Sequence, residues 1–120
     1  MLAEAHMEAW AAAFLASDPH SGSRTPASVS TPSGPMADIQ ALWSGHALFD
    51  AASIVAPTLL VRGAWDSLCT DDDAARLLAS IAAANKSDVK IDCATHLMHL
   101  EQQRGVLYER INAFLLQSLR

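Results

Sequence analysis

The chain has 120 residues, of which 51% are hydrophobic, and it carries a formal net charge of −5 at pH 7. This length allows one small domain with a modest core, and the composition is that of a globular rather than a disordered protein. Its 8 basic residues are scattered, which argues against a nucleic-acid partner, and no apolar run is long enough for a membrane span.

Residues 2–17 form an alanine-rich stretch in which large apolar residues recur at helical spacing. The spacing predicts an amphipathic helix that Asp18-Pro19 ends. The stretch lacks the basic start of a secretory signal and carries acidic residues instead, so we expect no export signal. The large apolar residues of the stripe are Met7, Trp10, Phe14 and Leu15.

The two cysteines, Cys69 and Cys93, show neither metal-ligand spacing nor a disulfide framework. We expect both thiols to be buried, in a protein of a reducing compartment, the cytoplasm.

Residues 19–37 are rich in proline, glycine, serine and threonine, which predicts a loop and the least ordered part of the chain. A short helix should follow from Met36 or Ala37 to Trp43, with Ser44-Gly45 as its stop. The histidines near these segments, His6, His20 and His46, are expected at the surface.

Residues 54–63 form an apolar run closed by Gly63, the pattern of a strand buried on both faces, which Pro57 can begin. Thr70 followed by residues 71–73, all aspartates, predicts a solvated helix start with a hydroxyl cap rather than a metal cluster. We expect that helix to end at residues 85–87.

A second strand should contain Val89, Ile91 and Cys93, which alternate with polar residues. A last helix is expected from about Gln102 to Leu119, with an apolar stripe on one side. Strand, helix and strand in this order predict two parallel strands, and therefore an α/β fold.

Polar side chains follow the carboxyl ends of both strands. Asp66 follows the first strand and His96 the second, and loops at this edge of a parallel sheet are where reactive groups collect. A carboxylate that accepts a hydrogen bond from an imidazole fixes its tautomer and leaves the other nitrogen as a base. We therefore expect Asp66 and His96 to lie side by side.

These residues carry a family resemblance: residues 56–63 with Asp66, then Ala94-Thr95-His96 with Glu101, resemble the closing part of the α/β-hydrolase superfamily. The resemblance covers about residues 54–116 and implies a partial α/β-hydrolase fold, with Asp66 as catalytic acid and His96 as general base. It implies a small-molecule ester or other acyl substrate, and neither a cofactor nor a metal.

By the same resemblance, residues 1–53 are the end of a helical lid and residues 54–120 belong to the hydrolase core. Trp43, Trp65 and Leu97 then become candidate walls of a substrate pocket. For the tryptophans and leucines at helical spacing, packing in a core is the competing interpretation.

The chain departs from the family at the nucleophile, because it contains no Gly-x-Ser-x-Gly elbow. We therefore expect a C-terminal fragment that is inactive alone, whether a truncation, a partial sequence or half of a split enzyme. The alternative is a non-catalytic interaction module derived from the family. Without the neighbouring strands, the first strand should expose an apolar edge through which the chain self-associates.

Two further interpretations concern residues near His96. The spacing of His96 and His99 could bring both imidazoles to a metal, but zinc needs at least one more ligand. We expect instead that His99 lines the start of the last helix and that Glu101 caps or neutralises that start.

Overall fold

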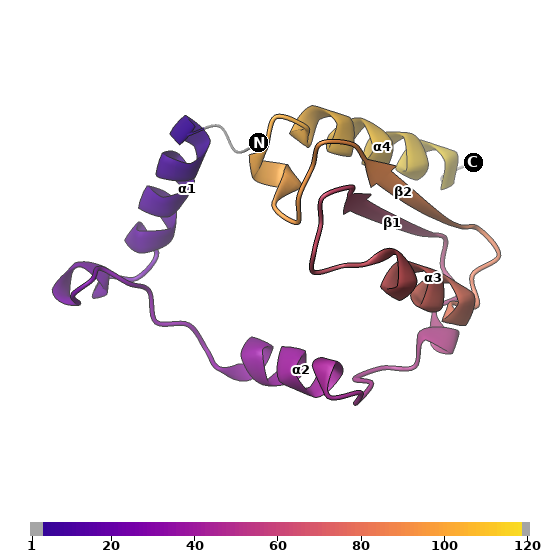
Figure 1. Ribbon diagram of the computed structural model, residues 1–120, viewed down its shortest axis with the longest axis horizontal. Helices are drawn as coiled ribbons and strands as arrows, with labels where there is room; N and C mark the ends of the chain where they lie inside the picture. The colour runs from indigo at the N-terminus through magenta and orange to yellow at the C-terminus, as the bar shows by residue number, and fades with distance from the viewer. Residues whose placement is uncertain (1–3, 119–120) are drawn as a thin grey trace. The chain divides into compact units, whose positions relative to one another are not determined.

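The computed structural model describes residues 4–118, which divide into two compact units (Figure 1). Glu4–Asp50 form the helical unit, and residues from 51 to 118 form the sheet unit. The division falls after Asp50 rather than after residue 53. Leu2 and Leu119, which belonged to the predicted first and last helices, lie outside the described residues.

The helical unit begins with α1, Glu4–Ala16, where the sequence predicts a helix. None of residues 4–50 is buried. The rings of Trp10 and Phe14, one helical turn apart, stack with centroids 5.2 Å apart and planes 9° from parallel. These two large apolar side chains of α1 therefore contact each other along the helix.

The segment after α1 is organised by one carboxylate. Asp18 accepts hydrogen bonds from the backbone N–H of His20 at 2.8 Å and of Ser30 at 2.9 Å. It also pairs with Arg24 at 2.7 Å, and Arg24 donates to the carbonyl of Ser28 at 2.6 Å. Between a short 3₁₀ turn at Ser21–Ser23 and residue 32 the chain is a loop, as predicted, but this loop has specific polar contacts.

The helix α2, Gly34–Trp43, begins earlier than the sequence predicts because Pro35 occupies its first turn, where proline is favoured. Its predicted stop is confirmed. Gly45 has φ +82°, a conformation that glycine adopts without strain, and the N–H of His46 donates to the carbonyl of Ala41 at 2.9 Å. This is the Schellman ending of a helix.

The sheet unit alternates helical segments with two parallel strands, which makes it α/β. Val61 lies opposite Val89 in the register. Its elements are the 3₁₀ turn η2 (Ala51–Ser53), β1 (Thr58–Gly63), α3 (Asp71–Ser80), β2 (Lys86–Ile91), the 3₁₀ turn η3 (Met98–Leu100) and α4 (Arg104–Ser118).

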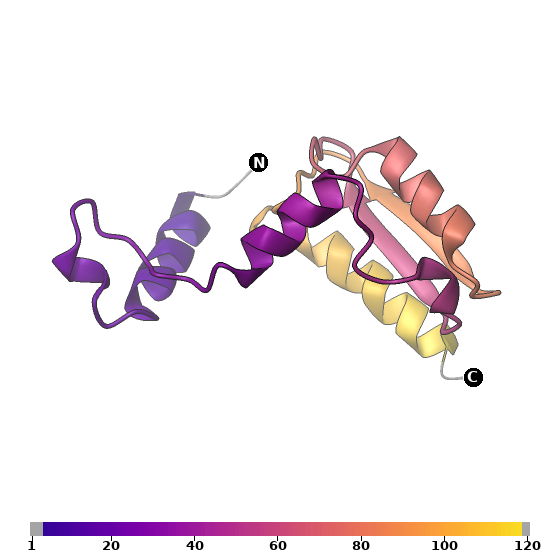
Figure 2. The same cartoon turned by 90° about the horizontal axis from the view of Figure 1, so that it is seen from below.

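The two long helices of the sheet unit lie on opposite faces of the sheet, as Figures 1 and 2 show. A small core of buried residues forms where β2 and the loop after it meet α4. Its buried residues are Ile91, Ala94 and Met98, against which Val61, Val89 and Leu107 pack. The core therefore lies directly beneath the loop that carries His96.

The predicted start of α3 is confirmed and its predicted end is wrong. The hydroxyl of Thr70 accepts from the N–H of Asp73, whose carboxylate accepts from the N–H of Thr70, a complete capping box. The helix ends at Ser80 because Ile81 turns to extended backbone (φ −66°, ψ 130°) and is buried. Lys86 and Ser87, expected to end the helix, are the first residues of β2.

One expectation about burial also needs correction. Residues 58–61 of β1 are half-buried rather than buried, because only β2 pairs with β1 within the described residues. The aspartates after Thr70 are exposed, as expected, and Asp71 also pairs with Arg62 at 2.7 Å and with Lys90 at 2.6 Å. In β2, the predicted alternation of exposed and more buried residues is confirmed as far as Ile91, but Cys93, predicted in this strand, lies beyond its end and is exposed.

Arg62 is a buried cation of the sheet unit. Its guanidinium donates to both carboxylate oxygens of Asp88, at 2.9 and 2.6 Å, and to Asp71 at 2.7 Å. These ion pairs connect β1, β2 and the start of α3. Between residues 4 and 118, every helix is too short or too polar to cross a membrane.

Candidate active site

The loops after β1 and β2 are held against each other by backbone hydrogen bonds. The N–H of Ala64 donates to the carbonyl of Ile91 at 2.8 Å, and that of Trp65 donates to the carbonyl of Ala94 at 2.9 Å. A Cβ atom at Gly63 would lie well under 3.0 Å from the backbone of Ala94. Only glycine allows this approach, so Gly63 is what brings the two loops together.

The structure confirms that Asp66 and His96 lie in contact. Nδ1 of His96 is 3.0 Å from Oδ2 of Asp66. The other carboxylate oxygen of Asp66 accepts from the N–H of Leu68 at 2.8 Å and of Cys69 at 3.1 Å. The Asp66 side chain is 4% exposed and that of His96 is 51% exposed, so the pair has a fixed inner member and an accessible outer one.

The ionisation of Asp66 assigns the proton on His96. Burial by itself raises the pKa of the Asp66 carboxyl, but hydrogen bonds from His96 and from the N–H groups of Cys69 and Leu68 outweigh it and lower that pKa. The ionised carboxylate can only accept, so Nδ1 of His96 must be the donor. A neutral His96 then has its lone pair on Nε2, which is the nitrogen of a general base.

Glu101 holds the loop that carries His96. The Glu101 side chain, only 1% exposed, accepts from the N–H of Thr95 at 2.8 Å and from the hydroxyl of Thr95 at 3.0 Å. The Thr95 hydroxyl in turn accepts from the N–H of Leu97 at 3.2 Å. The expectation that Glu101 caps the last helix is therefore wrong, because its carboxylate faces the residue before His96 and α4 begins later.

Cys69 is the site residue that the sequence did not single out. Its Sγ lies 4.0 Å from Nδ1 of His96, and burial, followed by the charges of Asp66 and Asp73, raises the pKa of its thiol. The expectation of two buried thiols is wrong, since both Cys69 and Cys93 are exposed residues. The spacing Asp66-x-x-Cys69 on one loop is the signal that could have indicated this proximity.

Cys69 is not placed as a nucleophile for His96. Its sulfur approaches Nδ1, the nitrogen that already serves Asp66, whereas a nucleophile must be hydrogen-bonded to Nε2. Its raised pKa also works against a thiolate at neutral pH.

Potential metal ligands converge at one place in the part of the chain that the structure describes. The ligand atoms of Asp66, Cys69 and His96 all lie within 4.8 Å of one another. His99, which the sequence suggested as a partner of His96, is an exposed residue of η3 and does not belong to this group.

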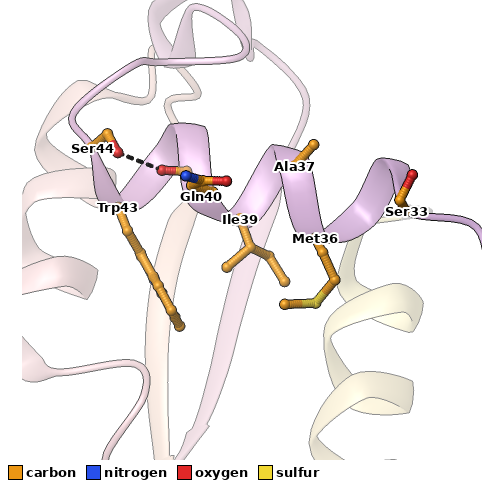
Figure 3. A pocket seen from close by; sticks show the side chains of 7 residues that line it. All are labelled: Ser33, Met36, Ala37, Ile39, Gln40, Trp43 and Ser44. Atoms are coloured by element: carbon orange, nitrogen blue, oxygen red, sulfur yellow. Dashed lines mark hydrogen bonds between the residues drawn. The ribbon is translucent and has the colours of Figure 1, made fainter.

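The predicted pocket residues divide between the two units. Trp65 and Leu97 are exposed neighbours of Asp66 and His96 in the sheet unit, whereas Trp43, 79% exposed, belongs to the helical unit. Trp43, Ile39 and Met36 project from the same side of α2 and line a hollow there (Figure 3). Its lining residues all come from α2 and the two residues that flank it, so it is an apolar helix face rather than an enclosed pocket.

Comparisons with family models, with curated proteins and with solved structures find no match to this chain. The functional assignment therefore depends on the geometry of Asp66, His96 and their supports.

Proposed function

We propose that this chain is the C-terminal part of a serine-type α/β-hydrolase that cleaves an ester or a related acyl compound. In this proposal Asp66 is the acid and His96 the general base of a catalytic triad. The observation that carries the proposal is the 3.0 Å contact between Nδ1 of His96 and a well-buried carboxylate, at the carboxyl ends of two parallel strands.

The chemistry follows from the proton on His96. With Nδ1–H donated to Asp66, Nε2 can take the proton of a serine hydroxyl as that oxygen attacks an acyl carbon. Asp66 stabilises the imidazolium that forms, and Nε2 returns the proton to the leaving group. In the second half of the reaction, Nε2 activates the attacking water in the same way.

The nucleophile must come from residues outside this sequence. The 120 residues contain no Gly-x-Ser-x-Gly elbow, and Cys69 faces the wrong nitrogen. We therefore expect the chain alone to be inactive. The same missing elbow is what favours the alternative, a non-catalytic module that keeps the acid and histidine of its parent.

The proposal also predicts that one edge of the sheet is exposed and able to pair with another copy of the chain. Within the described residues, β1 pairs with β2 and with no other strand, so its second edge carries unpaired backbone groups beside half-buried leucines. We expect concentration-dependent self-association, measured as molar mass by light scattering. A strictly monomeric chain at all concentrations would contradict this expectation.

The orientation of His96 is tested first, since it needs no nucleophile. Nitrogen NMR of the imidazole should show the Nδ1–H tautomer at a pH where His96 is neutral. In Asp66→Asn the tautomer balance should shift toward Nε2–H, whereas His99→Ala should leave the His96 signals unchanged. A wild-type Nε2–H tautomer, or no response to Asp66→Asn, would contradict the role of Asp66.

Activity is tested second, with a generic activated ester. We expect the purified chain to hydrolyse it no faster than buffer, and joining the chain to a nucleophile-bearing segment should create turnover that His96→Ala and Asp66→Asn abolish. Turnover by the chain alone that depends on His96 would reveal a nucleophile within it. Restored turnover that is indifferent to His96 would refute the general-base role.

A further inference from the structure

Three side chains of different chemistry converge beyond the ends of β1 and β2. One ligand atom each from Asp66, Cys69 and His96 lies within 4.8 Å of the other two. Nδ1 of His96 is 3.0 Å from Oδ2 of Asp66 and 4.0 Å from Sγ of Cys69. Oxygen, sulfur and imidazole nitrogen together are the donor set of zinc sites in proteins, while magnesium and calcium prefer oxygen alone. The proposed hydrolase chemistry uses Asp66 and His96 but gives no role to Cys69.

We propose that Asp66, Cys69 and His96 bind a divalent zinc ion. Bond lengths of about 2.3 Å to sulfur and about 2.0 Å to nitrogen and oxygen place tetrahedral ligands about 3.5 Å (S···N) and about 3.3 Å (N···O) apart. The corresponding distances here are 4.0 Å and 3.0 Å. Shifts of about half an ångström or less, within side-chain rotation, would bring these two distances to the tetrahedral values.

The frame around the three ligands is already fixed. Asp66 Oδ1 accepts from the N–H of Cys69, so the backbone that carries the sulfur is tied to the carboxylate. Glu101 fixes Thr95 beside His96 on the other loop. Such hydrogen bonds around metal ligands orient them and strengthen the site.

The fourth position of the zinc would face solvent. Half of the His96 side chain is accessible, and Cys69 is an exposed residue. Three protein ligands with an open position are typical of zinc sites that exchange a water or another ligand, whereas structural sites are closed by a fourth residue.

Zinc binding and general-base catalysis exclude each other at Nδ1. The base needs a proton on Nδ1, donated to Asp66, whereas the metal needs the lone pair of the same nitrogen. Zinc would therefore also replace the hydrogen bond between Asp66 and His96. If the proposed hydrolase function holds, the metal is a reversible inhibitor, but the binding itself does not depend on that function.

The first experiment compares the two cysteines of the wild-type chain: Cys69 is the proposed zinc ligand and Cys93 is the internal control. The chain is alkylated with iodoacetamide with and without zinc, and modification of each cysteine is followed by peptide mass spectrometry. Zinc should slow alkylation of Cys69 by at least about tenfold and leave Cys93, near the start of the loop after β2, unaffected. No protection of Cys69, or equal protection of both thiols, would overturn the proposal.

The second experiment measures affinity by calorimetric titration of zinc and by the cobalt–thiolate absorption of the cobalt-substituted chain. Cys69→Ser should weaken binding by at least about tenfold and remove the thiolate band, while Cys93→Ser should change neither. His99→Ala should also bind as the wild type does. A thiolate band that survives in Cys69→Ser but disappears in Cys93→Ser would place the metal elsewhere. The cysteine protection in the wild-type chain keeps the proposal testable if Cys69→Ser does not fold.

Discussion

The helical unit and the sheet unit are both rich in apolar residues, yet the contacts that stabilise each unit internally are different. No residue of the helical unit is buried. Its contacts are the polar ones around Asp18 and at the end of α2, and the stack of Trp10 on Phe14 within α1. The sheet unit has a buried core of Ile91, Ala94 and Met98 and a buried arginine. Apolar content alone therefore does not produce a core. Residues far apart in sequence must pack on each other, as the parallel strands make them do.

Gly63→Ala should break the sheet unit most strongly. The new methyl would meet the backbone of Ala94, which cannot move aside as a flexible side chain can, so we expect a loss of about 3 kcal/mol or more in unfolding free energy. Gly105→Ala, in α4 with open space around it, should be neutral or slightly stabilising. Urea unfolding followed by circular dichroism compares the two variants, and equal stabilities would refute the close approach of the loops.

Arg62→Met should have the next largest effect, since it leaves Asp88 and Asp71 without their shared cation. We expect a loss of about 2 kcal/mol, less than for a fully buried pair because both aspartates keep contact with water. Arg76→Ala removes an exposed pair with Asp73 and should cost no more than about 0.5 kcal/mol. A similar cost for both would mean that the buried network contributes nothing special.

Glu101→Ala should cost about 2 kcal/mol, because two donors of Thr95 lose their acceptor in a buried place. It should also loosen His96, seen as a broader mixture of imidazole tautomers by NMR. The matched control is Glu109→Ala, an exposed carboxylate of α4. If both variants retained the wild-type stability and tautomer, Glu101 would not support the site.

The prediction with the smallest expected effect concerns the helical unit. Hydrogen bonds from the N–H of Ser30 and His20, then from Arg24, lower the pKa of Asp18 to about 2. Because this pKa is below the unfolded value, the loop contacts are complete above pH 4 or so and are lost as the pH falls toward about 2. The amide signals of His20 and Ser30 should therefore titrate with a midpoint near 2, and Asp18→Ala should abolish that titration. A midpoint near the ordinary carboxyl value would contradict the loop contacts.

The sequence predicts best where a local signal decides the structure. Thr70 with Asp73 marks a helix start, Gly45 marks a helix end, and a strand ends at Gly63 as expected. The two parallel strands then place Asp66 and His96 together. These features depend on backbone propensities and on the topology of a strand–helix–strand unit, both of which can be inferred from residue order.

The incorrect predictions concern contacts between residues distant in sequence. The end of α3 depends on the burial of Ile81, and the role of Glu101 depends on the position of Thr95 in the folded loop. Cys69 approaches His96 because the loops after β1 and β2 come close together where Gly63 contacts the backbone of Ala94. The local sequence around these residues does not indicate the tertiary packing that determines these three features.

The ion pairs of Arg62 have a consequence for the specificity of folding. In the observed alignment of the strands, Arg62 lies opposite Lys90 and reaches diagonally to Asp88. If β2 slid by one residue, Asp88 would turn to the opposite face and the buried guanidinium would lose its best partner. The competing alignment would then contain an unpaired buried charge, which is far more costly than a missing surface contact. Arg62 therefore favours the observed strand register over misaligned ones, even if an apolar residue at this position could give the same net stability.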